Sequence, residues 1–255
     1  GALGYESIAL SVDHHALNPY EKDGQFHHRL EEIRDLLRHL RLSSVVETGA
    51  RFLLNPWVKH EPTLVSPDQA LRDQRLDFLE KCIGIAAALG SDAVSIWSGV
   101  KSSGVSRDEA WEFLVDGCQK ICETASKSGV AVAFEPEPGM LVENMEQYDR
   151  LRRAVNHQAF KLTLDLGHAF ITEKSVPETI LAFKDDIVNI HLEDMKKDRH
   201  DHLFFGKGDM DFHLIFSALE KIEYKGPVNI ELSRHSPDAV SFCKKALDFV
   251  QKLRA

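Results

Sequence analysis

The sequence is poor in cysteine, has no long apolar run and carries no excess of positive charge. Its four cysteines include no C-x-x-C pair, and four in 255 residues do not make a disulfide framework. The longest apolar stretch, residues 83–89, is far shorter than the ~20 residues that a bilayer span requires, and the first residues do not resemble a signal peptide. We therefore expect a cytoplasmic protein in a reducing compartment, with no membrane partner.

The charge balance and the composition exclude further classes of protein. Thirty-one Lys and Arg against 40 Asp and Glu give a net charge of −9, which disfavours nucleic acid as a partner. With 43% hydrophobic and 28% charged residues, the chain is neither disordered nor collagen-like. Its length matches the roughly 250 residues of one α/β barrel, and no linker or charge block divides it. We expect a single domain, residues 1–255.

Short apolar, β-branched runs alternate with longer helical patterns along the whole chain. The runs are residues 7–12, 44–47, 93–97, 130–134, 161–164, 187–191 and 227–231. Apolar residues dominate them, as in strands buried on both faces, whereas residues 111–122 and 240–253 follow the 3.6-residue helical period. This alternation predicts parallel strands joined by right-handed crossovers, and therefore an α/β fold of the barrel type.

Residues 2–8 weakly echo residues 88–94, because in both segments a glycine precedes a strand-like run. In the second copy a helical pattern comes before the glycine, whereas the first copy stands at the start of the chain. We expect that a first strand and helix normally precede residue 1, so that seven runs and one more would form an eight-stranded (β/α)₈ TIM barrel. The alternative is that residues 1–6 are an ordinary frayed start.

Ionisable residues stand where most of the apolar runs end. Six of the seven runs lead to such a residue, namely Asp13, Glu47, Glu135, Asp165, His191 and Glu231, and only the run that ends at Trp97 differs. Ionisable groups in such places are costly unless they are paired or bound to a metal. Because the carboxyl ends of barrel strands form the mouth that carries the active site, we expect these side chains to meet there.

Four of these residues form a plausible set of metal ligands. Glu135, Asp165, His191 and Glu231 supply three carboxylates and one imidazole. Oxygen-rich ligation with a single histidine suits a divalent cation such as Mn²⁺, Mg²⁺ or Co²⁺, whereas Zn²⁺ normally takes more nitrogen or sulfur. The alternative is that each carboxylate is a strand end paired with a lysine or an arginine.

A second group of candidate residues follows the sixth run, within residues 198–208. His200 and His202, two residues apart in an expected loop, could ligate a metal, contact a substrate or belong to a solvated polar loop. Lys207 lies between two glycines that could approach an anion, or that form a turn before a helix capped by Asp211. His60, after the second run, is a further candidate for the mouth.

Five segments together carry a resemblance to a known superfamily. They are Phe134-Glu135-Pro136, Leu164-Asp165-Leu166-Gly167-His168-Ala169, Ile190-His191-Leu192-Glu193-Asp194, Gly206-Lys207-Gly208 and Ile230-Glu231. The chain resembles the xylose isomerase-like TIM barrel superfamily, which includes sugar isomerases, ketose 3-epimerases and endonuclease IV. The resemblance implies that Glu135, Asp165, His191 and Glu231 hold one divalent metal ion, with Mn²⁺ favoured. It also implies that the two glutamates act as acid and base and that His168 contacts the substrate.

The resulting hypothesis is a metal-dependent isomerase or epimerase that moves a proton next to a carbonyl through an enediolate. The expected partner is a small carbohydrate: a sugar, a sugar phosphate or a ketoinositol. We expect His60, Trp97, His168 and Lys207 to contact it, and Trp97 and Phe205 to wall the pocket against water. A hydride shift is the alternative within the same class, and the oligomeric state is left open.

Two other classes of function stay open. A zinc-dependent phosphodiester hydrolase of the endonuclease IV type would need further zinc ligands, and His168, His200 and His202 could bind a second zinc ion. The strand-end histidine that this branch would place near Trp97 is absent from the sequence. A barrel that binds a sugar without catalysis is the third class, because a fold does not establish an activity.

Overall fold

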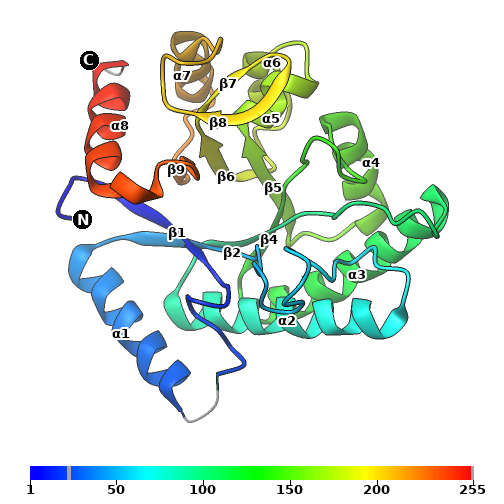
Figure 1. Ribbon diagram of the computed structural model, residues 1–255. Helices are drawn as coiled ribbons and strands as arrows, with labels where there is room; N and C mark the ends of the chain where they lie inside the picture. The colour runs from blue at the N-terminus through cyan, green and yellow to red at the C-terminus, as the bar shows by residue number, and fades with distance from the viewer. Residues whose placement is uncertain (22–23, 254–255) are drawn as a thin grey trace.

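The structure, a computed structural model, describes residues 1–21 and 24–253. In these residues seven parallel strands pair in sequence order to form a nearly closed barrel (Figure 1). The strands are β1 (Ser7–Ser11), β2 (Ser43–Glu47), β3 (Ala93–Ile96), β4 (Ala131–Phe134), β5 (Phe160–Asp165), β6 (Ile187–Leu192) and β9 (Val228–Ile230). Each of the seven apolar runs therefore forms a strand, and the expected barrel fold is confirmed.

Eight α-helices within the described residues connect the strands and surround the barrel (Figure 1). They are α1 (Gln25–Leu40), α2 (Gln69–Leu89), α3 (Arg107–Lys127), α4 (Met145–Val155), α5 (Leu166–Thr172), α6 (Val176–Ala182), α7 (Phe212–Lys221) and α8 (Ala239–Leu253). Residues at helical spacing on α3, such as Leu114, Cys118 and Ile121, are buried in the core. None of the described helices combines the length and the apolar character needed to cross a bilayer.

A two-stranded antiparallel hairpin interrupts the alternation of strands and helices after β6. It consists of β7 (Asp194–Lys196) and β8 (Arg199–Leu203) and is the yellow ribbon in Figure 1. The expectation that His200 and His202 lie in a loop is wrong, because both belong to β8. Residues two apart on a strand share a face, so the two imidazoles point to the same side. A polar strand of this kind carries no apolar alternation by which sequence could reveal it.

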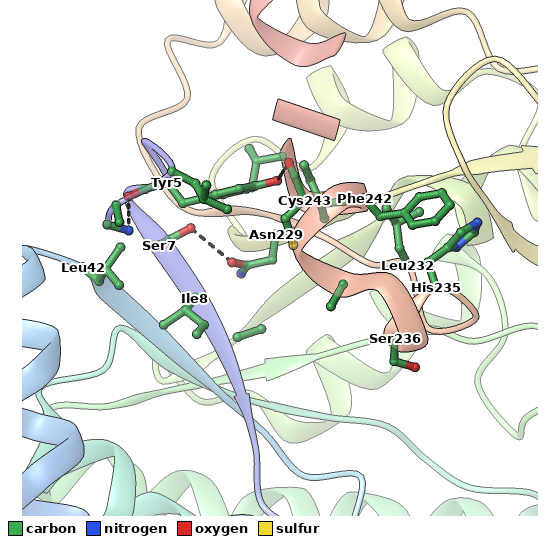
Figure 2. A pocket seen from close by; sticks show the side chains of 17 residues that line it. Tyr5, Ser7, Ile8, Leu42, Asn229, Leu232, His235, Ser236, Phe242 and Cys243 are labelled. Atoms are coloured by element: carbon green, nitrogen blue, oxygen red, sulfur yellow. Dashed lines mark hydrogen bonds between the residues drawn. The ribbon is translucent and has the colours of Figure 1, made fainter. Parts of the chain in front are cut away.

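The two edge strands of the barrel, β1 and β9, face each other across a seam. Side chains bridge it: Ser7 Oγ donates to Asn229 Oδ1 (3.1 Å), and the Tyr5 hydroxyl donates to the Cys243 carbonyl of α8 (2.8 Å). Figure 2 shows the groove of about 460 Å³ at this seam, lined by β1, β9 and the start of α8. The candidate catalytic residues lie elsewhere, at the carboxyl ends of the strands.

Candidate active site

Backbone pairing between the barrel strands brings the four candidate metal ligands close together. Asp165 and His191 are directly opposite each other in the β5–β6 pairing. The N–H of Glu135 donates to the Ile96 carbonyl of β3 (2.7 Å), and the N–H of Glu231 donates to the Leu192 carbonyl of β6 (3.1 Å). Both glutamates therefore extend the ladder by one residue past the strand ends, where their side chains face the mouth.

The side chains of these four residues converge on one nitrogen atom. His191 Nδ1 lies 3.2 Å from Glu135 Oε1, 3.4 Å from Glu231 Oε2 and 3.8 Å from Asp165 Oδ2. Glu135, Asp165 and His191 are buried, and Glu231 is partly open to solvent. Within the described part of the chain, their ion-pair partners are histidines, and neither lysine nor arginine is among them. The alternative, that each carboxylate is a strand end paired with a lysine or an arginine, therefore does not hold for these residues.

A carboxylate on β2 holds the other nitrogen of His191. Glu47 Oε1 lies 3.0 Å from His191 Nε2, and Asn189 Nδ2 donates to the same oxygen over 3.5 Å. When His191 is neutral and its Nε2–H donates to Glu47, the lone pair of Nδ1 would face the three carboxylates, which is the arrangement that an imidazole ligand needs. Burial opposes the charged form of His191, but Glu135 and Glu47 outweigh it and raise its pKa well above the ordinary value.

The mouth gathers acidic groups in a place with little water. Burial raises the pKa of Glu135 to about 8, although His191 beside it acts in the opposite direction. Burial, together with Asp165 and Glu231, raises the pKa of Glu137 to about 7. Burial also opposes ionisation of Asp165, but His168 and His191 outweigh it and lower its pKa. A carboxylate cluster of this kind is stabilised by a bound cation.

The two carboxylate oxygens of Asp165 have different roles: one accepts a backbone hydrogen bond and the other faces the site. Its Oδ1 accepts the N–H of His168 (2.7 Å) and so caps α5, whereas its buried Oδ2 has no hydrogen-bond partner among the described residues. Three carboxylates, one imidazole and an unpartnered buried oxygen fit a hard or borderline divalent cation. Glu135, Asp165, His191 and Glu231 would hold it.

Three further histidines lie beside this set. His168 Nε2, on α5, lies 2.8 Å from His200 Nε2 on the hairpin, and the ring centroids of His168 and His202 are 5.9 Å apart. His168 Nδ1 is 3.3 Å from the Pro136 carbonyl. Burial lowers the pKa of His168 to about 4, with Asp165 acting in the opposite direction. His168 is therefore neutral near pH 7, and a substrate hydroxyl could take the place of His200 at its Nε2 atom.

His60, in the loop between β2 and α2, lies beside Trp97, which directly follows β3. Their rings meet edge to face with centroids 5.6 Å apart, and His60 Nδ1 lies 2.5 Å from the Gly49 carbonyl. The guanidinium of Arg75, which is buried on α2, lies 4.8 Å from the centroid of the Trp97 ring and donates to the Thr48 carbonyl (2.9 Å). This contact supports the ring of Trp97.

Lys207 and Phe205, both expected to contact the substrate pocket, lie in different surroundings. Lys207 is exposed, and its backbone N–H donates to Asp194 Oδ2 (3.0 Å). Phe205 is 4% exposed and stacks on Phe249 of α8 with ring centroids 4.7 Å apart. The expectation that Phe205 walls the pocket is wrong, because the chain leaving β8 turns this ring into the core between α7 and α8.

Sequence reasoning assigned no role to several residues around the mouth. Asp194 accepts the N–H groups of Met195, Lys207 and Gly208 over 2.8 to 3.0 Å, so that it ties the turn to the hairpin. Glu193 is fully buried, and neither of its carboxylate oxygens accepts a hydrogen bond from a donor among the residues that the structure describes. Burial, together with Asp165 and Glu231, raises the pKa of Glu193 well above the ordinary value. In the sequence they appear only as a pair of acids directly after a strand, within one of the segments that carry the family resemblance.

Comparisons with known proteins agree with the fold. The family described as xylose isomerase-like TIM barrel matches residues 2–253. An L-ribulose-5-phosphate 3-epimerase, UlaE, of Shigella flexneri serotype 5b is 27% identical over 254 residues, which are 98% of this chain and 85% of that protein.

Two solved structures share the fold. The 3-keto-D-glucoside 4-epimerase YcjR from E. coli has a TM-score of 0.79 at 16% identity, covering 98% of this chain and 90% of its own. An L-ribulose 3-epimerase has a TM-score of 0.79 at 21% identity, covering 99% of this chain and 85% of its own. Because the family match spans nearly all of the sequence, the resemblance is confirmed: the protein belongs to the xylose isomerase-like TIM barrel family.

Proposed function

We propose that the protein is a divalent-metal-dependent epimerase or isomerase that transfers a proton next to the carbonyl of a small sugar. The observation that carries the proposal is the convergence of Glu135, Asp165 and Glu231 on His191 Nδ1, each within 3.8 Å. The relatives are named as sugar epimerases, which supports a ketose, a ketose phosphate or a related ketoinositol as substrate. Mn²⁺ is the favoured cation, because oxygen donors outnumber the single nitrogen donor.

A cation bound by these four residues would polarise the substrate carbonyl and stabilise the negative charge that develops on it. Glu135 and Glu231 project from β4 and β9, with β5 and β6 between them, so they reach the space above His191 from two sides. One glutamate removes the proton from carbon, and the other returns a proton to the opposite face. Which glutamate begins depends on the configuration of the substrate.

The other candidate residues hold the substrate and exclude water. His168, neutral at pH 7, binds a substrate hydroxyl and keeps the reacting carbon in line with the two glutamates. His200 lies 2.8 Å from His168 and orients its ring. Trp97 and His60 form one wall of the site, and Lys207 is the candidate for an anionic group at the far end of the substrate.

Solvent-exchange labelling tests the reaction directly. Purified protein loaded with Mn²⁺ is incubated in D₂O with a panel of ketoses, ketose phosphates and ketoinositols, and the carbon next to the carbonyl is examined by NMR. Deuterium at that carbon is the expected result. Turnover without deuterium incorporation would favour the hydride shift, and binding without turnover or exchange would favour a barrel that only binds sugars.

Isosteric variants test the assignment of the acid and the base. We expect Glu135→Gln and Glu231→Gln each to lower kcat by roughly 10²–10⁴-fold, the usual contribution of a positioned general acid or base. Glu178→Gln, at an exposed position on α6, is the matched control and should retain full activity. If both active-site variants kept wild-type turnover, the acid–base assignment would be wrong.

The cluster of His168, His200 and His202 supports one competing function, a zinc-dependent phosphodiester hydrolase. These three residues offer nitrogen atoms within 4.8 Å of one another, as a further zinc site would require. The net charge of −9 opposes binding to DNA. Cleavage of DNA that contains an abasic site by the zinc-loaded protein would favour this alternative.

A further inference from the structure

The barrel interior directly below the candidate site is polar. Ser95, Thr163, Asn189 and Asn229, on β3, β5, β6 and β9, each stand two residues before a residue of the site. Because residues two apart on a strand share a face, these four side chains point into the barrel one layer below the site. All four are buried. Barrel interiors are usually filled by Val, Ile and Leu, and a polar layer is costly there unless its members are hydrogen-bonded.

Hydrogen bonds within this polar layer fix the orientation of the Asn189 amide group. Asn229 Nδ2 donates to Asn189 Oδ1 (2.9 Å), so the amide oxygen of Asn189 is occupied on the side away from the site. Asn189 Nδ2 donates to Thr163 Oγ1 (3.3 Å) and to Glu47 Oε1 (3.5 Å). Thr163 passes its own hydrogen to Ser95 Oγ (3.0 Å) and can therefore accept from Asn189. The N–H groups of Asn189 thus face the Glu47 carboxylate, which can only accept.

Asn189 and Glu47 lie against the same nitrogen atom of His191. Asn189 Nδ2 is 3.2 Å and Glu47 Oε1 is 3.0 Å from His191 Nε2. The amide group has two hydrogens, and because Thr163 and Glu47 accept them, none remains for Nε2. His191 therefore donates its own Nε2 hydrogen to Glu47, in a charge-assisted bond that is roughly twice as strong as a neutral one. If Asn189 donated to Nε2 instead, the hydrogen of the neutral ring would lie on Nδ1 and block the ligand atom.

We propose that Asn189 is a positioning residue of the candidate site, which orients the Glu47 carboxylate and so keeps the hydrogen of the neutral His191 ring on Nε2. The Nδ1 atom is then open to a cation. Asn229 and Thr163 hold the Asn189 amide in the orientation that this role requires. The inference rests on the proposed function, because it assigns His191 as a metal ligand. Asn189 itself lies one layer below the site and acts through Glu47 and His191.

Proton NMR of the metal-free, full-length protein tests this role without a cation or a substrate. The Nε2 hydrogen of His191 should give a low-field resonance that exchanges slowly with water, because it is buried and donates to a carboxylate. The resonance is assigned by its loss in His191→Gln. We expect Asn189→Leu, which keeps the approximate shape of the side chain, to shift the resonance to higher field and to abolish its slow exchange. An unchanged resonance would overturn the proposal.

Titration with Mn²⁺, followed by electron paramagnetic resonance, tests the consequence for metal binding. Asn189→Leu and Glu47→Gln should each lower the affinity for Mn²⁺ by roughly 10–100-fold, the usual effect of removing a group that orients a metal ligand. In the double variant the two losses should not add, because Asn189 acts through Glu47. Fully additive losses would overturn the proposal. A wild type that binds no Mn²⁺ would contradict the proposed function, whereas the NMR experiment would still decide the role of Asn189.

Ser44→Ala is the matched control, because it removes a buried side-chain hydrogen bond of β2, the one to Ser91 Oγ (2.7 Å), outside the polar layer. It should leave both the His191 resonance and the affinity for Mn²⁺ unchanged. If Asn189→Leu fails to fold, Thr163→Val decides the question. This variant keeps the shape of the side chain but frees one amide hydrogen of Asn189 for His191 Nε2, so it should produce both effects. A Thr163→Val protein with neither effect would then overturn the proposal.

Discussion

The metal-free protein should lose stability as the pH rises from 6.5 to 8, and Glu135 is the main reason. Burial raises the pKa of this carboxyl from 4.5 to about 8. The folded state therefore holds the proton more tightly than the unfolded state does. Stability that depends on the protonated carboxyl is fully present below about pH 4.5, falls as the pH rises between the two pKa values and is lost above about pH 8.

The size of the effect follows from the pKa of Glu135. Between pH 6.5 and 8 the unfolded state has already released this proton, whereas the folded state still holds much of it. The difference in bound protons lowers the free energy of unfolding by about 2 kcal/mol over this range for one group. Glu137, with its pKa raised to about 7, and His191, with its pKa raised, act in the same direction. The lowered pKa values of Asp165 and His168 have their effect mainly below this window.

Thermal denaturation of the chelator-treated protein at the two pH values measures this loss. For a chain of this size, about 2 kcal/mol corresponds to a Tm lower by roughly 4–8 °C at pH 8. Adding Mn²⁺ should raise Tm more at pH 8 than at pH 6.5, because the cation binds the deprotonated carboxylates. Glu135→Gln should flatten the pH dependence of the metal-free protein. A metal-free wild type that is equally stable or more stable at pH 8 would refute the reasoning.

Three substitutions outside the set of Glu135, His191 and Glu231 test the packing of the barrel. Gly167→Ala should lower the free energy of unfolding, measured in urea, by about 1–3 kcal/mol, because the new methyl group would lie 2.0 Å from Glu193 Oε1. An unchanged midpoint of unfolding would mean that the Glu193 side chain moves aside freely. Asp194→Ala should lower the free energy of unfolding by about 2–4 kcal/mol and speed amide hydrogen exchange at Lys207, since it removes the acceptor of several backbone N–H groups. Exchange as slow as in the wild type would contradict this role. Tyr148→Phe should change the unfolding free energy by less than about 0.5 kcal/mol, as its buried hydroxyl has no partner within the described residues, whereas a large loss would reveal a hidden one.

The barrel strands and the residues at their ends were predictable from the sequence because both are local patterns. A strand buried on both faces must be a short apolar run, and parallel strands bring their carboxyl ends to one edge of the sheet. Once the runs are recognised, the residues at their ends are expected at the same edge of the sheet, and four of them do meet there, whereas Asp13 accepts the N–H groups of His15 and Ala16 in its own loop. Glu135, Asp165, His191 and Glu231 could therefore be grouped from positions that lie far apart along the chain.

Only the tertiary structure decided what surrounds those four residues. The β7–β8 hairpin has polar strands without apolar alternation, and it is held by Asp194 and by packing, so no local pattern marks it. The burial of Phe205 between α7 and α8 and the contact of Glu47 with His191 depend on partners distant in sequence. The sequence also could not show that no described donor reaches the buried carboxylate of Glu193, because this depends on every group that packs around the side chain.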